Sequence, residues 1–362
     1  MKAAVLREVN APMEIEDVQI SKPGPREVLI RTAYAGVCHS DLHFQDGSYP
    51  YPMPAILGHE SSGIVEEVGS EVTYVKPGDH VITCLSAFCG HCEHCLTGHM
   101  SLCQEPELQR GPDKEPRLSS GGEVVHQFLN LSSYAEQMLV HEHTIAKIRP
   151  DMPLDRAALI GCGTTTGVGA VIHTAGVKPG ETVAIIGCGG IGLAAVNGAS
   201  IAGASRIIAI DRVQSKLDLA KKFGATDVIN ASNLDPVGEV LEMTGGGVHY
   251  SFEAIGLKTT AEQAFNMLMR GGTATVIGMI PVGHMIEIHG AALLPERKIQ
   301  GCIMGSNRFR IDMPRYVDFY MSDKLYLDDM ISQRIKLDGV NEALAGLKEG
   351  GDIARSLIEF EH

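Results

Sequence analysis

Residues 182–196 read TVAIIGCGGIGLAAV and contain the strongest fold signal in this chain of 362 residues. The apolar run TVAII precedes the spacing GxGxxG, which Gly187, Gly189 and Gly192 form, and a helical pattern follows. Glycines between a strand and a helix let the backbone approach a pyrophosphate at the positive end of the helix dipole. The stretch therefore predicts a dinucleotide-binding unit.

Apolar strands and helical patterns alternate on the C-terminal side of this motif. After TVAIIG, the expected strands are RIIAID, DVIN, YSFEAIG and TATVIG. Helices are expected from about Gly190 and over 215–225, 237–246 and 261–270. This alternation predicts a parallel, doubly wound sheet.

Asp211 ends the second of these strands, about 20 residues beyond the glycine motif. A carboxylate at this position accepts hydrogen bonds from the adenosine ribose and repels a 2′-phosphate. We therefore expect NAD in preference to NADP. Arg212 and Lys216 are candidates to flank the adenosine, with a solvated surface as the alternative for either.

The first 160 residues have a different rhythm, with short β-rich runs separated by turns. VLIRTAYAGV and SSGIVEEVGSEV are two such runs, and KPGDHV at 76–81 is a turn. This half is expected to form a small barrel. The tail suggests helices at 314–324 and 339–350, and its last strand, 356–360, is expected to return to the first domain.

Composition limits the function classes. With 30 basic and 44 acidic residues the formal charge is −14, which disfavours nucleic-acid binding. No apolar run approaches the ~20 residues of a membrane span, and the start, MKAAVLREVNAP, resembles a first strand rather than a signal peptide. We expect a cytoplasmic protein, in which the nine cysteines are metal ligands and buried thiols rather than a disulfide framework.

Four of the cysteines form one closely spaced group. Cys89, Cys92, Cys95 and Cys103 have the spacing of a tetrahedral zinc site in a glycine-flanked loop. Four thiolates complete the coordination of Zn²⁺ and leave no position for a substrate. The group therefore predicts a structural zinc.

Ligand-type residues also occur in three separate segments, GVCHSDLH at 36–43, GHE at 58–60 and GCGTTTG at 161–167. Two cysteines and a histidine with a water form the open coordination set of a catalytic zinc. Spacing alone does not bring these segments together.

The whole set of motifs resembles the zinc-dependent medium-chain alcohol dehydrogenases. The resemblance extends from GVCHSD and GHE through the four-cysteine loop, GCG and GCGGIG to the closing ARSLIEF. It implies a GroES-like catalytic domain over 1–163 and 304–362, a Rossmann domain over 164–303, and an active site in the cleft between them.

The resemblance also implies roles for individual residues. Cys38, His59 and Cys162 become ligands of the catalytic zinc. Beside them, Glu60 lies near the metal, Asp41 orients His59, and Ser40 and His43 relay the alcohol proton. The cofactor-binding residues implied by motif and family together are Gly187, Gly189, Gly190, Ile191, Gly192, Asp211, Arg212, Lys216, His39, Thr166 and Arg355. The implied substrate pocket is apolar and aromatic, with Tyr49, Leu85, Phe128 and Leu129.

The implied reaction is the reversible oxidation of a hydrophobic primary or secondary alcohol to an aldehyde or ketone, with two zinc ions per chain and NAD. One alternative is the branch that oxidises the formaldehyde adduct of a thiol; it has acidic residues where this chain has Tyr49 and Tyr51. Another is a nucleotide-binding scaffold with structural zinc only. The insert after Cys103, which runs through residues 111–137, resembles that of the dimeric branch and suggests a homodimer joined edge to edge through the Rossmann sheet.

Overall fold

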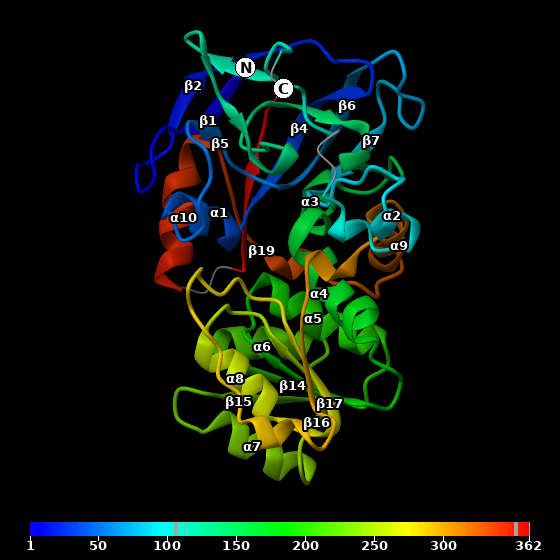
Figure 1. Ribbon diagram of the computed structural model, residues 1–362, viewed down its shortest axis with the longest axis vertical. Coiled ribbons are helices and arrows are strands. Elements are labelled where there is room, and N and C mark those ends of the chain that lie inside the picture. Colours follow the sequence, from blue (N-terminus) through cyan, green and yellow to red (C-terminus); the bar gives the residue numbers. More distant parts are fainter. Residues whose placement is uncertain (105–107, 112, 351–353, 362) are drawn as a thin grey trace. The chain divides into compact units, whose positions relative to one another are not determined.

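The computed structural model describes residues 1–104, 108–111, 113–350 and 354–361 (Figure 1). The chain divides into two compact units. The first comprises Met1–Cys162, Arg308–Ser322 and Met330–His362, and the second comprises Gly163–Asn307 and Asp323–Asp329. Four positions of the insert after Cys103, residues 105–107 and 112, lie outside the described residues.

The first unit is rich in β-strands, as predicted. Its largest sheet has the order β12-β7-β6-β4-β20-β19, and β11 also pairs with β4. The strands of this sheet are β4 Glu27–Val37, β6 Glu60–Val68, β7 His80–Thr83, β11 Gln137–His141, β12 Ile145–Lys147, β19 Ile331–Ile335 and β20 Arg355–Glu359.

Two smaller sheets complete the strands described in this unit, with the orders β10-β5-β1-β2 and β3-β8-β9. Their strands are β1 Lys2–Leu6, β2 Glu14–Asp17, β3 Gln19–Ile20, β5 Ala55–Ile56, β8 Leu118–Ser120, β9 Glu123–Val124 and β10 His126–Gln127. The helices are α1 His39–Gln45, α2 Glu93–Leu96, α3 Leu154–Leu159, α9 Phe309–Met321 and α10 Val340–Glu349.

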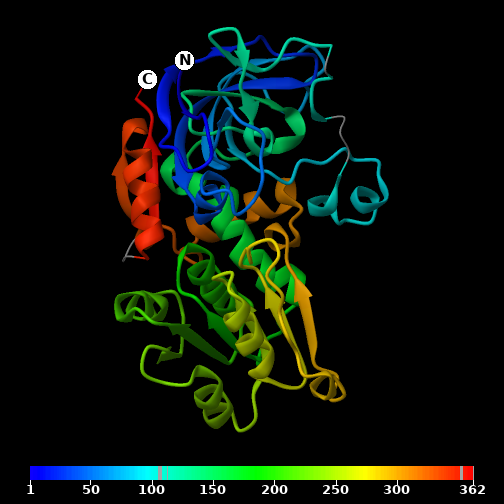
Figure 2. The same ribbon diagram turned by 60° about the vertical axis from the view of Figure 1, so that its left-hand side comes forward.

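The last strand joins the first unit, as the sequence suggested. β20 pairs antiparallel with β4, and Ser356 lies opposite Val37. Figure 2 shows α10 alongside this strand. The pairing brings Arg355 to the end of β4, where the segment with Cys38 begins.

The second unit contains the predicted parallel sheet, with the order β15-β14-β13-β16-β17-β18. Its strands are β13 Thr182–Ile186, β14 Arg206–Asp211, β15 Asp227–Asn230, β16 Val248–Glu253, β17 Leu268–Val276 and β18 Lys298–Gly301. Its helices are α4 Thr165–Gly169, α5 Gly190–Ile201, α6 Gln214–Lys222, α7 Pro236–Thr244 and α8 Lys258–Asn266. Since α5 packs against α6 and α7 against α8, the doubly wound fold class is confirmed.

Two predicted helix boundaries differ from the structure by more than three residues. The pattern placed a helix to residue 270, but α8 ends at Asn266 and β17 begins at Leu268, which pairs with Val248 in the buried sheet. α9 begins at Phe309, before the proline at 314 where the prediction started. Its buried positions Phe309, Met313 and Val317 repeat every four residues, so packing extends the helix through the proline.

Candidate metal centres and cofactor site

Cys38 lies at the junction of β4 and α1. It is the N-cap residue of α1, and its main-chain N–H donates to Oδ2 of Asp41, three residues later, at 3.2 Å. Only 1% of Cys38 is exposed, and Asp41 is fully buried. The turn between strand and helix therefore fixes the thiol and the carboxylate as one local unit.

His59 lies in the bend that precedes β6. Gly58 has φ +89°, a conformation that favours glycine. The ring of His59 is 1% exposed, and its Nδ1 lies 3.0 Å from Oδ1 of Asp41. Burial lowers the pKa of His59, but the Asp41 carboxylate outweighs burial and raises this pKa well above its usual range. A metal ion on Nε2 would take the place of the proton that this field attracts.

Cys162 lies in a π-helical segment, Ile160–Thr164, that follows α3. Such segments are frequent at functional sites. The neighbouring Gly161 packs tightly, since a Cβ added there would lie 3.1 Å from both the amide nitrogen of Ser61 and the carbonyl oxygen of Thr83. A larger residue at 161 would move Cys162 away from β6 and β7.

These three segments bring one group of ligand atoms together. The ligand atoms of Cys38, His59 and Cys162 lie within 4.8 Å of one another, and all three residues are buried. His59 Nε2 is buried without a hydrogen-bond partner in the described residues. The hydrogen bond with Cys162 lowers the pKa of Cys38 well below its usual range. Two thiols and one imidazole with a free Nε2 fit a zinc ion that keeps a fourth position open.

A buried ion pair lies beside this group. Nε of Arg355, from β20, lies 3.2 Å from Oε1 of Glu60, and its Nη2 lies 3.8 Å from Sγ of Cys38. Arg355 is 4% exposed and Glu60 is fully buried. The family resemblance implied that Arg355 contacts the cofactor, whereas the structure pairs its side chain with Glu60, Cys38 and, at 3.5 Å, the carbonyl of Ala354.

The four remaining ligand cysteines form a separate cluster. The Sγ atoms of Cys89 and Cys95, and those of Cys92 and Cys103, are 3.9 Å apart. A disulfide needs about 2.05 Å, whereas a tetrahedral zinc with bonds of about 2.3 Å separates its sulfurs by about 3.8 Å. All nine cysteines are free thiols. The cluster fits a closed zinc site.

The glycine motif has a different geometry at each position. Gly187 has φ +95°, and a Cβ on Gly192 would lie 1.7 Å from the carbonyl oxygen of Gly187. Gly189, the N-cap residue of α5, has no atom within 4 Å of an added Cβ. The tight turn, the open approach and the close helix packing are the three features that pyrophosphate binding requires.

Asp211 lies at the end of β14, where the prediction placed it. Its Oδ2 accepts from the N–H of Cys188 at 2.7 Å, so the carboxylate is tied to the glycine loop. Arg212 is exposed and Lys216 is half-buried. Ile191 is the second residue of α5, and the hydroxyl of Thr166, on α4, donates to Sδ of Met304 at 3.4 Å.

The residues predicted for the proton relay lie on α1. Oγ of Ser40 is 3.7 Å from Sγ of Cys38. The ring of His43 lies 5.2 Å from that of His39 and 6.0 Å from that of Tyr49, centroid to centroid. His39 is exposed, while His43 is half-buried.

The predicted pocket residues are brought together only in part. Phe128 is fully buried, and its ring lies 6.0 Å from that of His59. Leu129 packs against the same apolar cluster as Phe128, whereas Leu85 packs against a different cluster around Val28 and Val81.

Three further aromatic residues pack near the site: Phe44 and Tyr134, which the sequence analysis did not name, and Tyr51, which it named only in weighing the thiol-adduct reaction. Phe44 and Tyr51 pack edge to face on Phe128, at 4.7 and 5.1 Å. The hydroxyl of Tyr134 donates to Oδ2 of Asp41 at 2.7 Å. The only available signal was aromatic spacing around Tyr49, because tertiary contacts alone connect Tyr134 to the site.

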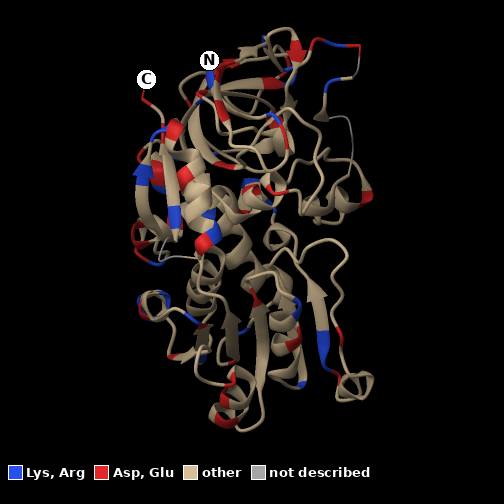
Figure 3. Ribbon diagram, turned by 90° about the vertical axis from the view of Figure 1, so that its left-hand side faces the viewer, with Lys and Arg blue, Asp and Glu red and all other residues tan. Residues whose placement is uncertain are grey.

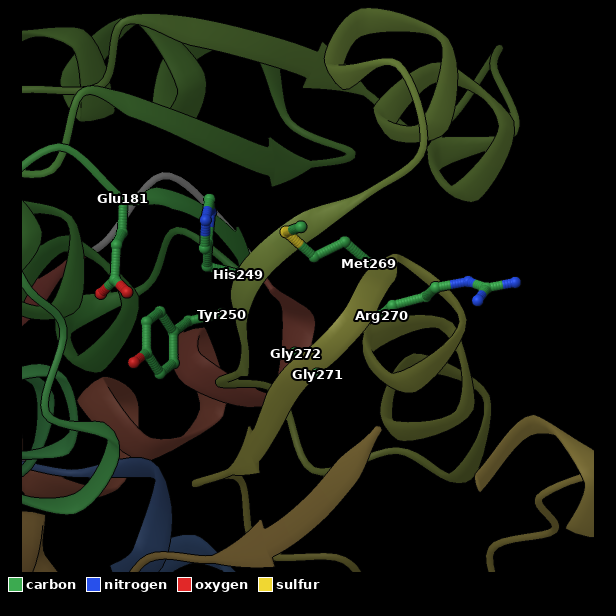
Figure 4. Close-up of a pocket in the computed structure, with 7 residues that line it drawn as sticks. All are labelled: Glu181, His249, Tyr250, Met269, Arg270, Gly271 and Gly272. Carbon is green, nitrogen blue, oxygen red and sulfur yellow. The ribbon is translucent and has the colours of Figure 1, made fainter. Parts of the chain in front are cut away.

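The second unit contains a cavity of about 120 Å³ (Figure 4). Its lining includes Glu181, His249 and Tyr250, at the starts of β13 and β16. The glycine motif follows the opposite, carboxyl end of β13. Since nucleotides bind at the carboxyl ends of parallel strands, this cavity is not the cofactor site.

Figure 3 shows Lys and Arg interspersed with Asp and Glu along the ribbon. None of the helices formed by the described residues combines the length and the apolar character needed to cross a bilayer.

Known proteins show the same two-part organisation. Residues 24–150 match the family model of the alcohol dehydrogenase GroES-like domain, and residues 190–322 match that of the zinc-binding dehydrogenases. The class-3 alcohol dehydrogenase of Oryza sativa subsp. japonica is 40% identical over 359 residues, which cover 97% of this chain and 94% of the relative.

Two solved structures are also similar. A zinc-binding-domain alcohol dehydrogenase protein of Burkholderia ambifaria has a TM-score of 0.95 and 36% identity, with 100% and 99% of the two chains covered. Benzyl alcohol dehydrogenase of Acinetobacter calcoaceticus has a TM-score of 0.94 and 33% identity, with 99% of each chain covered. The prediction is therefore confirmed, and the chain belongs to the zinc-dependent medium-chain alcohol dehydrogenases, which are oxidoreductases that use zinc and NAD.

Proposed function

We propose that this enzyme oxidises a hydrophobic primary or secondary alcohol at a zinc ion held by Cys38, His59 and Cys162. The observation that supports this ligand set is the convergence of the three buried ligand atoms within 4.8 Å. The unpartnered Nε2 of His59 agrees with it. The second zinc has a structural role and is held by Cys89, Cys92, Cys95 and Cys103.

When bound, the zinc supplies Lewis acidity that eases loss of the substrate's hydroxyl proton, and NAD accepts the hydride. Two thiolates and one neutral imidazole balance the charge of the ion. Asp41 holds Nδ1 of His59 and fixes its tautomer. Arg355 neutralises Glu60 beside the ligands and adds positive charge near the thiolate of Cys38.

Ser40 and His43 are the proposed route for the proton. Oγ of Ser40 lies beside the ligand Cys38, and His43 is one helical turn further along α1. The hydroxyl of Ser40 accepts the substrate proton while it gives up its own, and the half-buried imidazole of His43 passes that proton outward. Tyr49 borders this route through its ring contact with His43.

Aromatic side chains near His59 support a hydrophobic substrate. Phe128 packs on the ligand ring, with Phe44 and Tyr51 behind it and Leu129 beside it. The similarity to a benzyl alcohol dehydrogenase makes aromatic primary alcohols the first class to test. Leu85 remains a proposed lining residue, although it packs with another cluster.

The formaldehyde adduct of a thiol is the second candidate substrate. The 40% identity to a class-3 alcohol dehydrogenase favours it. Tyr49 and Tyr51 oppose it, because acidic residues stand at these positions in the adduct-oxidising branch. The hydroxyl of Tyr51 is also engaged by the main chain, since it donates to the carbonyl of Gln127 at 2.9 Å.

The test is NADH formation at 340 nm with NAD⁺ and aromatic, short aliphatic, long aliphatic and terpenoid alcohols. Formaldehyde with and without a thiol is assayed in parallel. Turnover of a free alcohol supports the proposal, and turnover only with formaldehyde plus thiol would replace it with the adduct reaction. No turnover by protein that contains a single zinc ion per chain would favour the scaffold interpretation.

We also propose that the cofactor binds at the glycine motif, with Gly187, Gly189, Gly190, Ile191 and Gly192 at the pyrophosphate side. Around it, the proposed contacts are Asp211, Arg212 and Lys216 at the adenosine, Thr166 at the nicotinamide, and His39 and Arg355 near the pyrophosphate.

Asp211→Gly should raise the kcat/KM ratio of NADP to NAD by about 100-fold, since a repelling carboxylate is removed. Gly would also break the bond to the Cys188 amide, so Asp211→Asn serves as the control that keeps an acceptor.

A homodimer is the assembly that we propose. β18 is the end strand of the parallel sheet in the described residues, and an unpaired edge can continue a sheet into a second copy. In the chain that precedes β18, Val282, Met285 and Leu294 are 69%, 75% and 84% exposed. Sedimentation velocity should show a dimer, and Leu294→Asp should shift it toward monomer.

Location and domain limits also remain proposals. A cytoplasmic location agrees with nine free thiols, because a reducing compartment preserves them. We propose a catalytic domain over residues 1–163 and 304–362 and a cofactor domain over 164–303. The compact units have boundaries within a few residues of these limits, except that 323–329 are grouped with the second unit.

A further inference from the structure

The carboxylate of Asp41 receives four hydrogen bonds. Its Oδ1 accepts from the N–H of Gly58 at 3.1 Å and from Nδ1 of His59 at 3.0 Å. Its Oδ2 accepts from the N–H of Cys38 at 3.2 Å and from the hydroxyl of Tyr134 at 2.7 Å. A carboxylate has about four lone-pair positions, so all of them are used.

Tyr134 differs from the other three donors. Cys38 and His59 are themselves ligands, and Gly58 precedes one, so these donors move with the metal site. Tyr134 belongs to another segment, ahead of β11, and makes the shortest of the four contacts. It is the one donor of the four that is neither a proposed ligand nor the chain neighbour of one.

The main chain and packing fix the position of this hydroxyl. The N–H of Tyr134 donates to the carbonyl of Leu57 at 3.1 Å, and its own carbonyl accepts from the N–H of Ala4 at 2.9 Å. The ring is fully buried against Gly58, where an added Cβ would lie 2.5 Å from Cδ1 of Tyr134. Burial and the charge of Asp41 raise the pKa of Tyr134 well above its usual range, so the hydroxyl keeps its proton and donates.

We propose that Tyr134 is a positioning residue, whose hydroxyl fixes the Asp41 carboxylate so that His59 presents Nε2 to the catalytic zinc. The inference rests on the proposed ligand set. Without this hydrogen bond Oδ2 loses one of its two donors, and the carboxylate can rotate away from the plane of the imidazole. The expected consequence is looser binding of the zinc, with the reacting residues otherwise intact.

The primary test uses Tyr134→Phe, which removes the hydroxyl and keeps the ring. Loss of a partner behind a metal ligand typically weakens metal affinity or activity by 10–100-fold. We expect about 10-fold faster release of the catalytic zinc to a colorimetric chelator and a kcat about 10-fold lower, with an unchanged dissociation constant for NAD. Loss of activity during chelation identifies which release phase belongs to the catalytic site.

Two controls separate this role from a general effect on folding. The four-cysteine site of the same variant should release zinc at the wild-type rate. Tyr34→Phe removes another tyrosine–carboxylate bond of the first unit, in which the Tyr34 hydroxyl donates to Glu359 at 3.0 Å. It should leave both zinc release rates and kcat unchanged. Faster release at both sites of Tyr134→Phe would indicate a merely structural role and overturn the proposal.

Asp41→Asn tests the same contact from the acceptor side, including the case in which Tyr134→Phe does not fold. If Tyr134 acts through Asp41, adding Tyr134→Phe to Asp41→Asn should change zinc release by less than twofold, whereas independent effects would multiply. If the effects of the two substitutions on the zinc release rate multiply, the inference is overturned. It is also overturned if wild type and Tyr134→Phe release the catalytic zinc at equal rates. A wild-type protein with a single zinc would instead overturn the ligand set and this inference together.

Discussion

The two ligand clusters of the first unit are built in different ways. Cys89, Cys92, Cys95 and Cys103 come from one short segment and are half-exposed, whereas Cys38, His59 and Cys162 come from distant segments and are buried. In the four-cysteine segment, α2 has no buried residue and Leu96 is 74% exposed. A segment with so little core depends on its metal, as small zinc domains do.

The three-ligand set depends on the fold instead. β4, the bend before β6 and the π-helical segment after α3 each supply one ligand, and hydrogen bonds to Asp41 join two of them. Because the sheets and the hydrophobic core already stabilise this part of the fold, loss of the metal from the buried site should abolish catalysis without unfolding the protein. Zinc is therefore expected to stabilise the fold at the four-cysteine site and to take part in catalysis at the buried site.

The largest expected effect comes from removing a ligand of the buried set. His59→Ala should lower kcat/KM by about 10⁴-fold, because Lewis-acid activation is worth several kcal/mol and each 1.36 kcal/mol is tenfold in rate. Metal analysis should find one zinc per chain, with little change in melting temperature. His94→Ala, an exposed histidine beside the other cluster, is the control and should keep both ions. If His59→Ala still contains two zinc ions per chain, His59 is not a ligand that the buried site requires, and the comparison between the two sites fails.

Removing a ligand of the four-cysteine cluster should have the opposite signature. Cys92→Ser is expected to lower the melting temperature by about 10 °C, since losing a structural metal costs roughly 3–5 kcal/mol and large domains shift by about 2–4 °C per kcal/mol. At temperatures where the variant is folded, kcat should stay within about twofold of wild type. Cys302→Ser, outside both clusters, should retain both zinc ions and the wild-type melting temperature. An immediate loss of kcat in Cys92→Ser would show that the two sites are not independent.

A smaller effect concerns the chain that leaves the four-cysteine cluster. Arg110 and Arg117 lie on this chain, and both pair with Glu27 of β4, at 2.5 and 2.8 Å. Glu27 is 6% exposed. Burial raises its pKa, but Arg110 and Arg117 outweigh burial and lower the pKa of Glu27 to about 2.

This pKa predicts a pH dependence of stability. Because the pKa of Glu27 is depressed in the folded state, its contribution is present above the unfolded value near 4.5 and is lost as the pH falls toward 2. The difference corresponds to about 3 kcal/mol at neutral pH. Glu27→Gln should therefore lower the urea midpoint at pH 7, and its difference from wild type should shrink between pH 5 and pH 3. A difference independent of pH would exclude this explanation.

Three features could be predicted from the sequence because each depends on residues close together in the chain. They are the glycine motif, the order of strands and helices in the second unit, and the four-cysteine cluster. TVAII followed by GxGxxG specifies a strand, a turn and a helix through local backbone requirements alone. The helix boundaries at Asn266 and Phe309 were missed because sheet pairing and packing overrode the local pattern.

For the buried centre, the sequence by itself determined which side chains have suitable chemistry, and a family resemblance grouped Cys38, His59 and Cys162. Only the tertiary structure decided that their ligand atoms converge within 4.8 Å, that Arg355 pairs with Glu60, and that Tyr134 reaches Asp41. Spacing along the chain cannot specify such contacts, because pairing of β20 with β4 and packing of Tyr134 against Gly58 close long loops whose geometry depends on the whole fold.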